Sequence, residues 1–191
     1  QSVLSLPLEL DSSNTQALEK AMRMYNGKAM INSVNGKQSS MSEVFPLVQK
    51  YGGVVVCLCL DESGIPETAQ GRIDIAKKII KTAESYGIDK KDLVVDALVM
   101  TISTNKDNAK ETLKAVDYIR HELGVGTVLG VSNISFGLPK REAINTAFFT
   151  LALKAGLSAG IINPLSESMM NAYYSYNALE GFDDNCTQYI E

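Results

Sequence analysis

The chain has 191 residues, of which 45% are hydrophobic and 21% charged, so it can bury a core of about one domain and is not a disordered segment. Its formal net charge of -4 and its lack of Lys or Arg runs argue against nucleic acid as a partner. It contains no apolar run of the ~20 residues that a membrane-spanning helix needs, and no signal-peptide pattern. We therefore expect a cytoplasmic protein without a membrane partner.

Six short apolar runs alternate with helical patterns along the chain. The runs cover 7–10, 29–31, 54–60, 93–95, 127–132 and 159–162. The helical patterns cover 14–24, 42–51, 68–86, 107–123, 141–155 and 166–179. Glycines at 27, 52, 87, 124 and 156 follow the first five patterns, where a left-handed helix end favours glycine. This alternation predicts an α/β fold with right-handed βα crossovers.

The strands are almost continuously apolar, as in parallel strands that are covered on both faces. No glycine-rich nucleotide-binding motif follows any of them, and a polar residue ends each run. Both observations favour a closed (β/α)₈ barrel, the TIM barrel, over an open sheet. Such a barrel needs eight units and about 250 residues, whereas this chain offers six. We therefore predict a single domain over 1–191 that is an incomplete barrel without the two amino-terminal units.

Each apolar run stops at an Asp or Asn. These residues are Asp11, Asn32, Asp61, Asp96, Asn133 and Asn163. The carboxyl ends of parallel strands open onto the mouth of a barrel, so the pattern predicts one polar ring around one site. The alternative for each residue alone is a turn or a helix cap, since Asp and Asn favour both.

The cysteines and the histidine do not indicate a metal site. Cys57 and Cys59 lie in an apolar run where small thiols pack well, and a C-x-C pair beside one histidine is a poor zinc set. Cys186 lies in a polar tail, and His121 is expected on the surface at a helix end.

Several segments together resemble the pterin-binding family that uses methyltetrahydrofolate as a methyl donor, most closely the folate-binding domain of cobalamin-dependent methionine synthase. They are L-E-L-D-S-S at 8–13, G-K-A-M-I-N-S at 27–33, G-V-S-N-I-S-F at 130–136, R-E-A-I-N at 141–145 and G-L-S-A-G-I-I-N-P at 156–164. The resemblance covers nearly the whole chain in order. It implies a pterin-binding TIM barrel whose family members carry two earlier strands.

The resemblance places Asp11, Asn32 and Asp96 in the pterin pocket. A pterin presents a ring N–H and an amine as adjacent donors, which a carboxylate accepts together. By resemblance, Asn133 faces the N5 atom and is the catalytic residue, whose amide orients N5 but cannot itself supply a proton. Asn163 precedes Pro164 and is a further candidate contact with the pterin.

Two other residues are weaker candidates for the site. Asp61 completes the ring by position, but it also opens a good turn sequence. Arg141 is positioned to meet the glutamate tail of folate, although an ion pair with Glu142 or a solvated helix face explains it equally well.

The resemblance implies a methyltransferase that binds methyltetrahydrofolate and passes its methyl group to cobalamin or another corrinoid on a partner domain or protein, as in methionine synthesis. One alternative is a free-standing methyltransferase that acts on a corrinoid iron–sulfur protein. A second is dihydropteroate synthase, whose S-R-K element near the seventh strand is replaced here by S-N-I at 132–134. A third is a non-catalytic fragment or folate-binding module. The open sheet edges also predict pairing with another chain, for example as a homodimer.

Overall fold

The computed structural model describes residues 6–190, and this part of the chain forms one six-stranded sheet. All neighbouring strands are parallel, and their order in space is their order in the chain, β1-β2-β3-β4-β5-β6. The strands are β1 (Glu9–Asp11), β2 (Met30–Asn35), β3 (Val54–Leu58), β4 (Leu93–Asp96), β5 (Gly126–Gly130) and β6 (Ala159–Ile161). A sheet that never reverses its order winds in one direction, as a barrel does.

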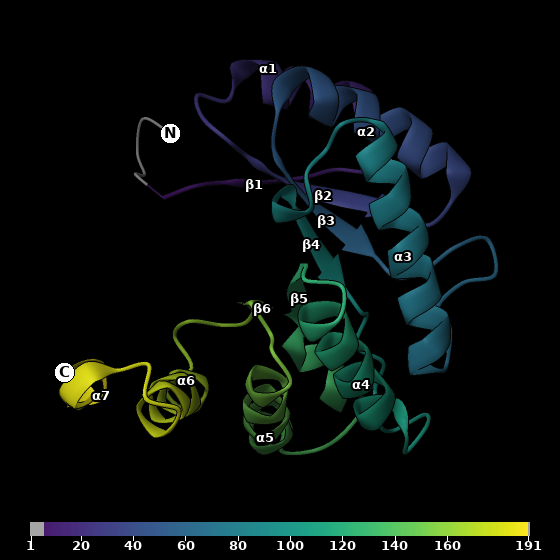
Figure 1. Cartoon of the computed structure of the whole chain (residues 1–191). Helices are drawn as coiled ribbons and strands as arrows, with labels where there is room; N and C mark the ends of the chain where they lie inside the picture. Colours follow the sequence, from purple (N-terminus) through teal and green to yellow (C-terminus); the bar gives the residue numbers. More distant parts are fainter. Residues whose placement is uncertain (1–5, 191) are drawn as a thin grey trace.

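A helix follows each strand and packs against the next helix along the chain. The longer helices are α1 (Thr15–Met24), α2 (Gln38–Tyr51), α3 (Ala69–Ser85), α4 (Asn108–His121), α5 (Arg141–Lys154) and α6 (Glu167–Leu179), and a short α7 (Thr187–Ile190) ends the described chain. Figure 1 shows the sheet curving with α1 to α5 along its outer side, so the six βα units form a half-barrel.

The register of the strands defines which side chains share a face of the sheet. Leu10 pairs with Ile31, and Ile31 pairs with Val55. Ile31 and Val55 are fully buried, and both belong to the core that the helices cover. Since side chains alternate along a strand, the neighbouring positions point to the concave face. That face carries no helix in Figure 1.

The helix ends follow the sequence closely. Asn14 caps α1 by accepting the N–H groups of Gln16 and Ala17, and Thr68 caps α3 by accepting that of Gly71. The five glycines that were expected to end helices all have positive φ. Cys57 and Cys59 are buried in the core, as expected, and His121 is the last residue of α4.

The strand boundaries differ from the expectation. Asp11 and Asp96 are the last residues of β1 and β4, not the first residues after them, and Asn32 lies within β2. The prediction that Asn32 stops its strand is therefore wrong. Its side chain points to the concave face, where a polar group needs no strand end, and the register with β3 shifts between Asn32 and Val34. After Gly130 the chain enters a 3₁₀ turn, η2 (Val131–Ser135), where a longer strand was expected.

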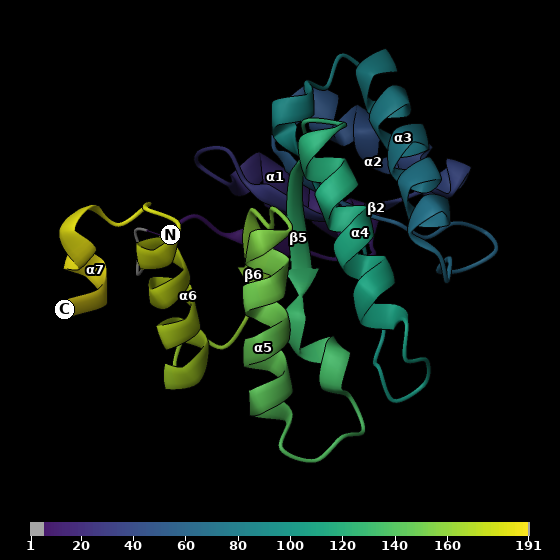
Figure 2. The ribbon, with the colours of Figure 1, turned by 60° about the horizontal axis from the view of Figure 1, so that its bottom comes forward.

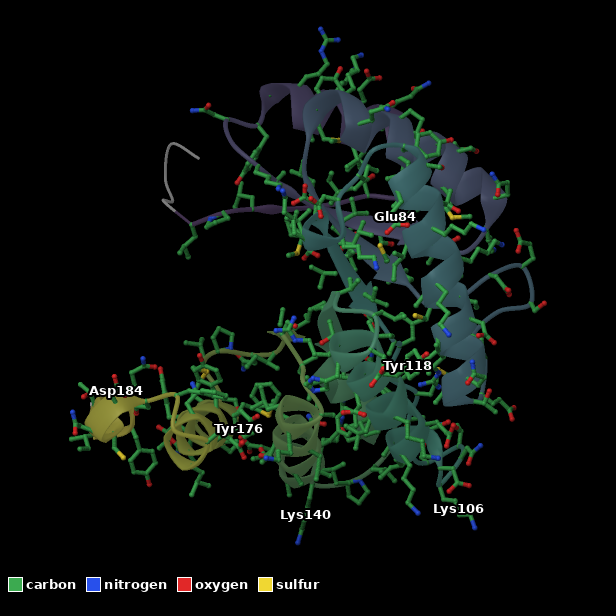
Figure 3. All side chains as sticks on the ribbon, viewed as in Figure 1. Glu84, Lys106, Tyr118, Lys140, Tyr176 and Asp184 are labelled. Atoms are coloured by element: carbon green, nitrogen blue, oxygen red, sulfur yellow. The ribbon has the colours of Figure 1, made fainter. Side chains whose placement is uncertain are left out.

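The two outer strands of the described half-barrel are alike in their pairing. Within residues 6–190, β1 pairs only with β2 and β6 pairs only with β5, so both have an open edge. A homodimer formed through these edges stays a prediction, which a measurement of the molar mass by light scattering would test. Beside β6, α5 and α6 pack together (Figure 2), and the Tyr176 hydroxyl, labelled in Figure 3, donates to the carbonyl of Leu153 at 3.1 Å. No helix within residues 6–190 is long and apolar enough to cross a membrane.

Candidate functional site

Asp11 and Asn32 lie side by side on the concave face of the sheet. They are register partners at the β1–β2 pair, and both line a cavity of about 330 Å³. Hydroxyl groups of the Ser12-Ser13 segment and of Ser33 share this cavity. The cavity therefore offers two carboxylates, two amides, several hydroxyls and one lysine ammonium, a set that can accept and donate hydrogen bonds to a heteroaromatic ring.

Glu9 belongs to the same face, although it does not end an apolar run and was not predicted as a site residue. It lies two residues before Asp11 on β1 and hydrogen-bonds to the Asn32 side chain. Burial and the nearby Asp11 raise its pKa, whereas the bond to Asn32 lowers it. The i, i+2 spacing of Glu9 and Asp11 in the sequence is the signal that could have found it.

Asp96 lies on the same face as Asp11 and Asn32. Asn32 pairs with Val56, Val56 pairs with Val94, and Asp96 follows two residues later. Its side chain is 8% exposed, and its Oδ1 accepts the N–H of Leu98 at 2.7 Å. Burial raises the pKa of Asp96 to about 6, although the Leu98 hydrogen bond and the charge of Arg72 both lower it. Asp96 is thus a buried carboxylate with remaining acceptor capacity.

Asn133 does not belong to a strand, yet its amide lies over the end of β5. A Cβ placed on Gly130 would come within 3.1 Å of the Asn133 Nδ2 atom. Gly130 has a φ of -74°, which any residue adopts, so glycine is needed here for the close approach alone. Because Val128 pairs with Asp96, the missing Gly130 side chain would point to the concave face. Asn133 therefore reaches the face that carries Asp96.

Arg141 holds the turn that carries Asn133. Its Nη2 donates to the carbonyl of Ser132 at 2.8 Å, and its Nε donates to Ser135 Oγ at 3.0 Å. Ser135 Oγ in turn donates to the Asn145 amide oxygen at 2.7 Å. No ion pair joins Arg141 to Glu142 in the described structure, and Glu142 instead accepts the hydroxyls of Ser166 and Ser168.

Asn163 lies beyond β6 at a second cavity of about 450 Å³, which Arg141 and Ser132 also line. Its amide oxygen accepts the N–H of Leu165 at 3.0 Å, so this oxygen is used in a local turn. The structure therefore places Asn163 and Arg141 together at the β5–β6 end of the half-barrel, beside the turn of Asn133.

Asp61 lies away from these residues. It follows β3 by three positions and accepts the N–H of Ser63 at 2.8 Å in a tight turn closed by Gly64. It lines a cavity of about 390 Å³ with Asp74 and Lys78, and this cavity shares no lining residue with the two others. The structure thus gives Asp61 the turn role and does not bring it to the concave face with Asp96.

The fold and this polar face define a known class of protein. The model of the pterin binding enzyme family matches residues 1–163, so the chain belongs to that family. A crystal structure of dihydropteroate synthase from Clostridium difficile, determined in the presence of pteroic acid, matches with a TM-score of 0.73 over 93% of this chain and 69% of that one. The two sequences are 20% identical, so this likeness confirms the barrel fold alone.

Curated relatives narrow the class. Methionine synthase of Mycobacterium tuberculosis is 34% identical over 181 residues, which are 87% of this chain and 15% of that protein. Methylcorrinoid:tetrahydrofolate methyltransferase of Eubacterium limosum is 28% identical over 194 residues, which cover 99% of this chain and 71% of that protein. The chain thus spans a small part of methionine synthase and most of the shorter methyltransferase.

Proposed function

We propose that this chain binds 5-methyltetrahydrofolate on the concave face and passes its N5 methyl group to a corrinoid on a partner domain or protein. The observation that carries the proposal is the shared face of Asp11, Asn32 and Asp96. The names of the relatives, a methionine synthase and a methylcorrinoid:tetrahydrofolate methyltransferase, support the choice of ligand and acceptor.

The chemistry follows from the residue types. A carboxylate accepts the paired N–H donors of a pterin in two parallel bonds, and Asp96 retains an oxygen that accepts no hydrogen bond within residues 6–190. At pH 7, above a pKa of about 6, Asp96 is mainly ionised and serves as this acceptor. Asn32 beside it can donate and accept at once.

Asn133 acts on the departing nitrogen. A tertiary amine is a poor leaving group, so a hydrogen bond at N5 that strengthens as charge develops lowers the barrier. An amide is not an acid at pH 7, so Asn133 orients N5 while the proton comes from solvent or from a network. When bound by the partner, the corrinoid supplies a reduced cobalt as the methyl acceptor.

Two measurements test the proposal. Titration calorimetry measures 5-methyltetrahydrofolate binding, and the absorbance of cob(I)alamin follows methyl transfer. We expect both binding and transfer, and we expect Asn133→Ala to lower the transfer rate by about 10²-fold with a much smaller change in affinity.

Each other result contradicts a part of the proposal. A loss in Asn133→Ala that lies wholly in binding means that Asn133 only anchors the substrate. Binding without transfer indicates a folate-binding module. Condensation of a pterin pyrophosphate with p-aminobenzoate, in place of methyl transfer, indicates a dihydropteroate synthase.

A further inference from the structure

Arg72 is a charged side chain in an unusual place. It lies in the first turn of α3, it is fully buried, and it is the largest of the fully buried side chains in the described structure. Its Nε donates to the carbonyl of Pro66 at 2.9 Å, and its Nη1 donates to Thr112 Oγ1 at 2.7 Å. These bonds tie the loop after β3 to α4.

One end of this guanidinium is not satisfied. The Nη2 atom of Arg72 is buried and has no hydrogen-bond partner within residues 6–190. A buried charged donor without a partner is costly, and native proteins pair such groups with an acceptor or an ordered water. The bonds to Pro66 and Thr112 use the other two nitrogens, so Nη2 needs an acceptor other than these two residues.

The neighbours of Arg72 identify the acceptor. The charges of two carboxylates, Glu111 and Asp96, act on it, together with the thiol of Cys59. Glu111 is already committed, because it accepts the N–H of Ala69 and the ammonium of Lys114, both at 2.7 Å. Burial raises the pKa of the Cys59 thiol far above neutral pH, so it stays uncharged. Asp96 is the carboxylate that remains.

The backbone brings Asp96 toward this region. The N–H of Cys59 donates to the carbonyl of Asp96 at 3.0 Å, which joins the start of the loop after β3 to the end of β4. The same loop, at Pro66, accepts from Arg72. Asp96 Oδ1 is used by Leu98, whereas Oδ2 accepts no hydrogen bond within the described residues. Arg72 and Asp96 are thus both hydrogen-bonded to the loop after β3, Arg72 at Pro66 and Asp96 at Cys59.

We propose that Arg72 is a positioning residue for pterin recognition, which fixes the orientation and the charge of the Asp96 carboxylate through an ordered water between Nη2 and Oδ2. Such a water makes two hydrogen bonds to groups that are otherwise unsatisfied, as buried waters do. Arg72 touches no substrate in this arrangement and acts through Asp96. The inference rests on the proposed function in that Asp96 is taken as the acceptor of the pterin.

Arg72→Met and Arg72→Lys separate the charge of this side chain from its bulk. The ¹³C chemical shift of the Asp96 carboxyl, followed against pH in the ligand-free protein, reports the pKa of Asp96 directly. We expect Arg72→Met to raise this pKa by about one unit and Arg72→Lys to leave it nearly unchanged. Arg72→Gln, which is also neutral but polar, replaces Arg72→Met if that variant does not fold.

Thr112→Val is the matched control. It removes the partner of Nη1 and so loosens the packing of Arg72, but it keeps the charge. We expect it to lower stability without moving the pKa of Asp96. An unchanged Asp96 pKa in both neutral Arg72 variants, or an equal shift in Thr112→Val, overturns the proposal.

Binding of 5-methyltetrahydrofolate to the same samples keeps this result apart from the proposed function. We expect the pH at which affinity is half lost to rise with the pKa of Asp96 in Arg72→Met. If the pKa moves and the affinity does not follow, then the link from Arg72 to Asp96 stands and the pterin role of Asp96 is wrong.

Discussion

Two carboxylates lie near the ends of neighbouring strands of this sheet, and their surroundings differ. Asp96 is the last residue of β4, is nearly buried, and points to the concave face. Asp61 lies three positions beyond β3, is half-buried, and caps a turn through the N–H of Ser63. In the sequence both simply follow an apolar run. The difference shows that a carboxylate within the strand keeps its place on the inner face, whereas one a few residues later belongs to the turn.

Asn133 can be compared with these two carboxylates by its position relative to its strand. It also lies beyond its strand, three residues after Gly130, yet its amide returns to the concave face over that glycine. Arg141 holds the turn in place through Ser132 and Ser135. A residue after a strand can therefore reach the site if the chain folds back tightly and the strand end carries no side chain.

The largest expected effect is on pterin affinity. Asp96→Asn keeps the acceptor for Leu98 but loses the charge that takes both pterin donors, so we expect affinity to fall roughly 30- to 150-fold, or about 2–3 kcal/mol. Asp61→Asn is the matched control and should stay within about twofold, because the amide oxygen still caps its turn. Calorimetric titration with 5-methyltetrahydrofolate measures both. Equal losses would show that the two carboxylates do not have different roles.

The same pair should differ in stability, with opposite signs. The pKa of Asp96 is about 6 in the folded chain against an ordinary value of 3.8, so the folded state holds a proton that the unfolded state releases between these values. Stability from this group is present below pH 3.8 and is lost as pH rises through about 6. We expect Asp96→Asn to raise the free energy of unfolding at pH 8 by up to about 3 kcal/mol.

Asp61→Ala is the other half of this stability test. It removes the acceptor of the Ser63 N–H and should lower the free energy of unfolding by about 0.5–1 kcal/mol. Urea unfolding at pH 4 and pH 8 measures both variants. Our account of Asp96 fails if Asp96→Asn is less stable than the parent chain at pH 8.

Much of the fold could be predicted from the sequence. The apolar runs, the helix caps and the glycines after the helices are local signals, and they gave the correct number and order of βα units. Strand ends could not be placed to the residue, because the concave face tolerates polar side chains within a strand, as at Asn32. An error of one or two residues in a strand end decides whether a carboxylate such as Asp96 or Asp61 is assigned to the inner face or to a turn.

The rest of the site depends on contacts between distant segments. Glu9 could not be predicted from the ends of the apolar runs, because it lies inside one, although it shares the face of Asp11. Arg72 was missed because a charged residue in a helix is usually solvated, and its burial depends on Thr112 in another helix. Arg141 was a weak candidate for the folate tail, which stays a prediction, and its bonds to Ser132 and Ser135 add a role in holding a turn that the sequence did not indicate.

Pterin affinity should also depend on pH through the charge of Asp96. If the ionised Asp96 accepts the pterin donors, affinity should fall as pH drops through about 6. We expect binding at pH 5 to be about tenfold weaker than at pH 7. Asp96→Asn is the control, because any remaining slope in that variant comes from the ligand or from other groups such as Glu9. Parallel slopes in the parent chain and in Asp96→Asn would refute the role of the Asp96 charge.

The smallest expected effect comes from displacing the Asn133 amide from its position over the end of β5. In Gly130→Ala the new Cβ would lie 3.1 Å from Asn133 Nδ2, so the amide must shift by a few tenths of an ångström. We expect methyl transfer to slow by about three- to tenfold with little loss of folate affinity. Gly126→Ala is the matched control on the same strand, because its Cβ would meet its nearest neighbours at 3.6 Å, an ordinary contact. Neither glycine has a positive φ, so backbone strain contributes to neither variant. Equal rates in the two variants would mean that the position of the Asn133 amide over β5 does not matter for transfer.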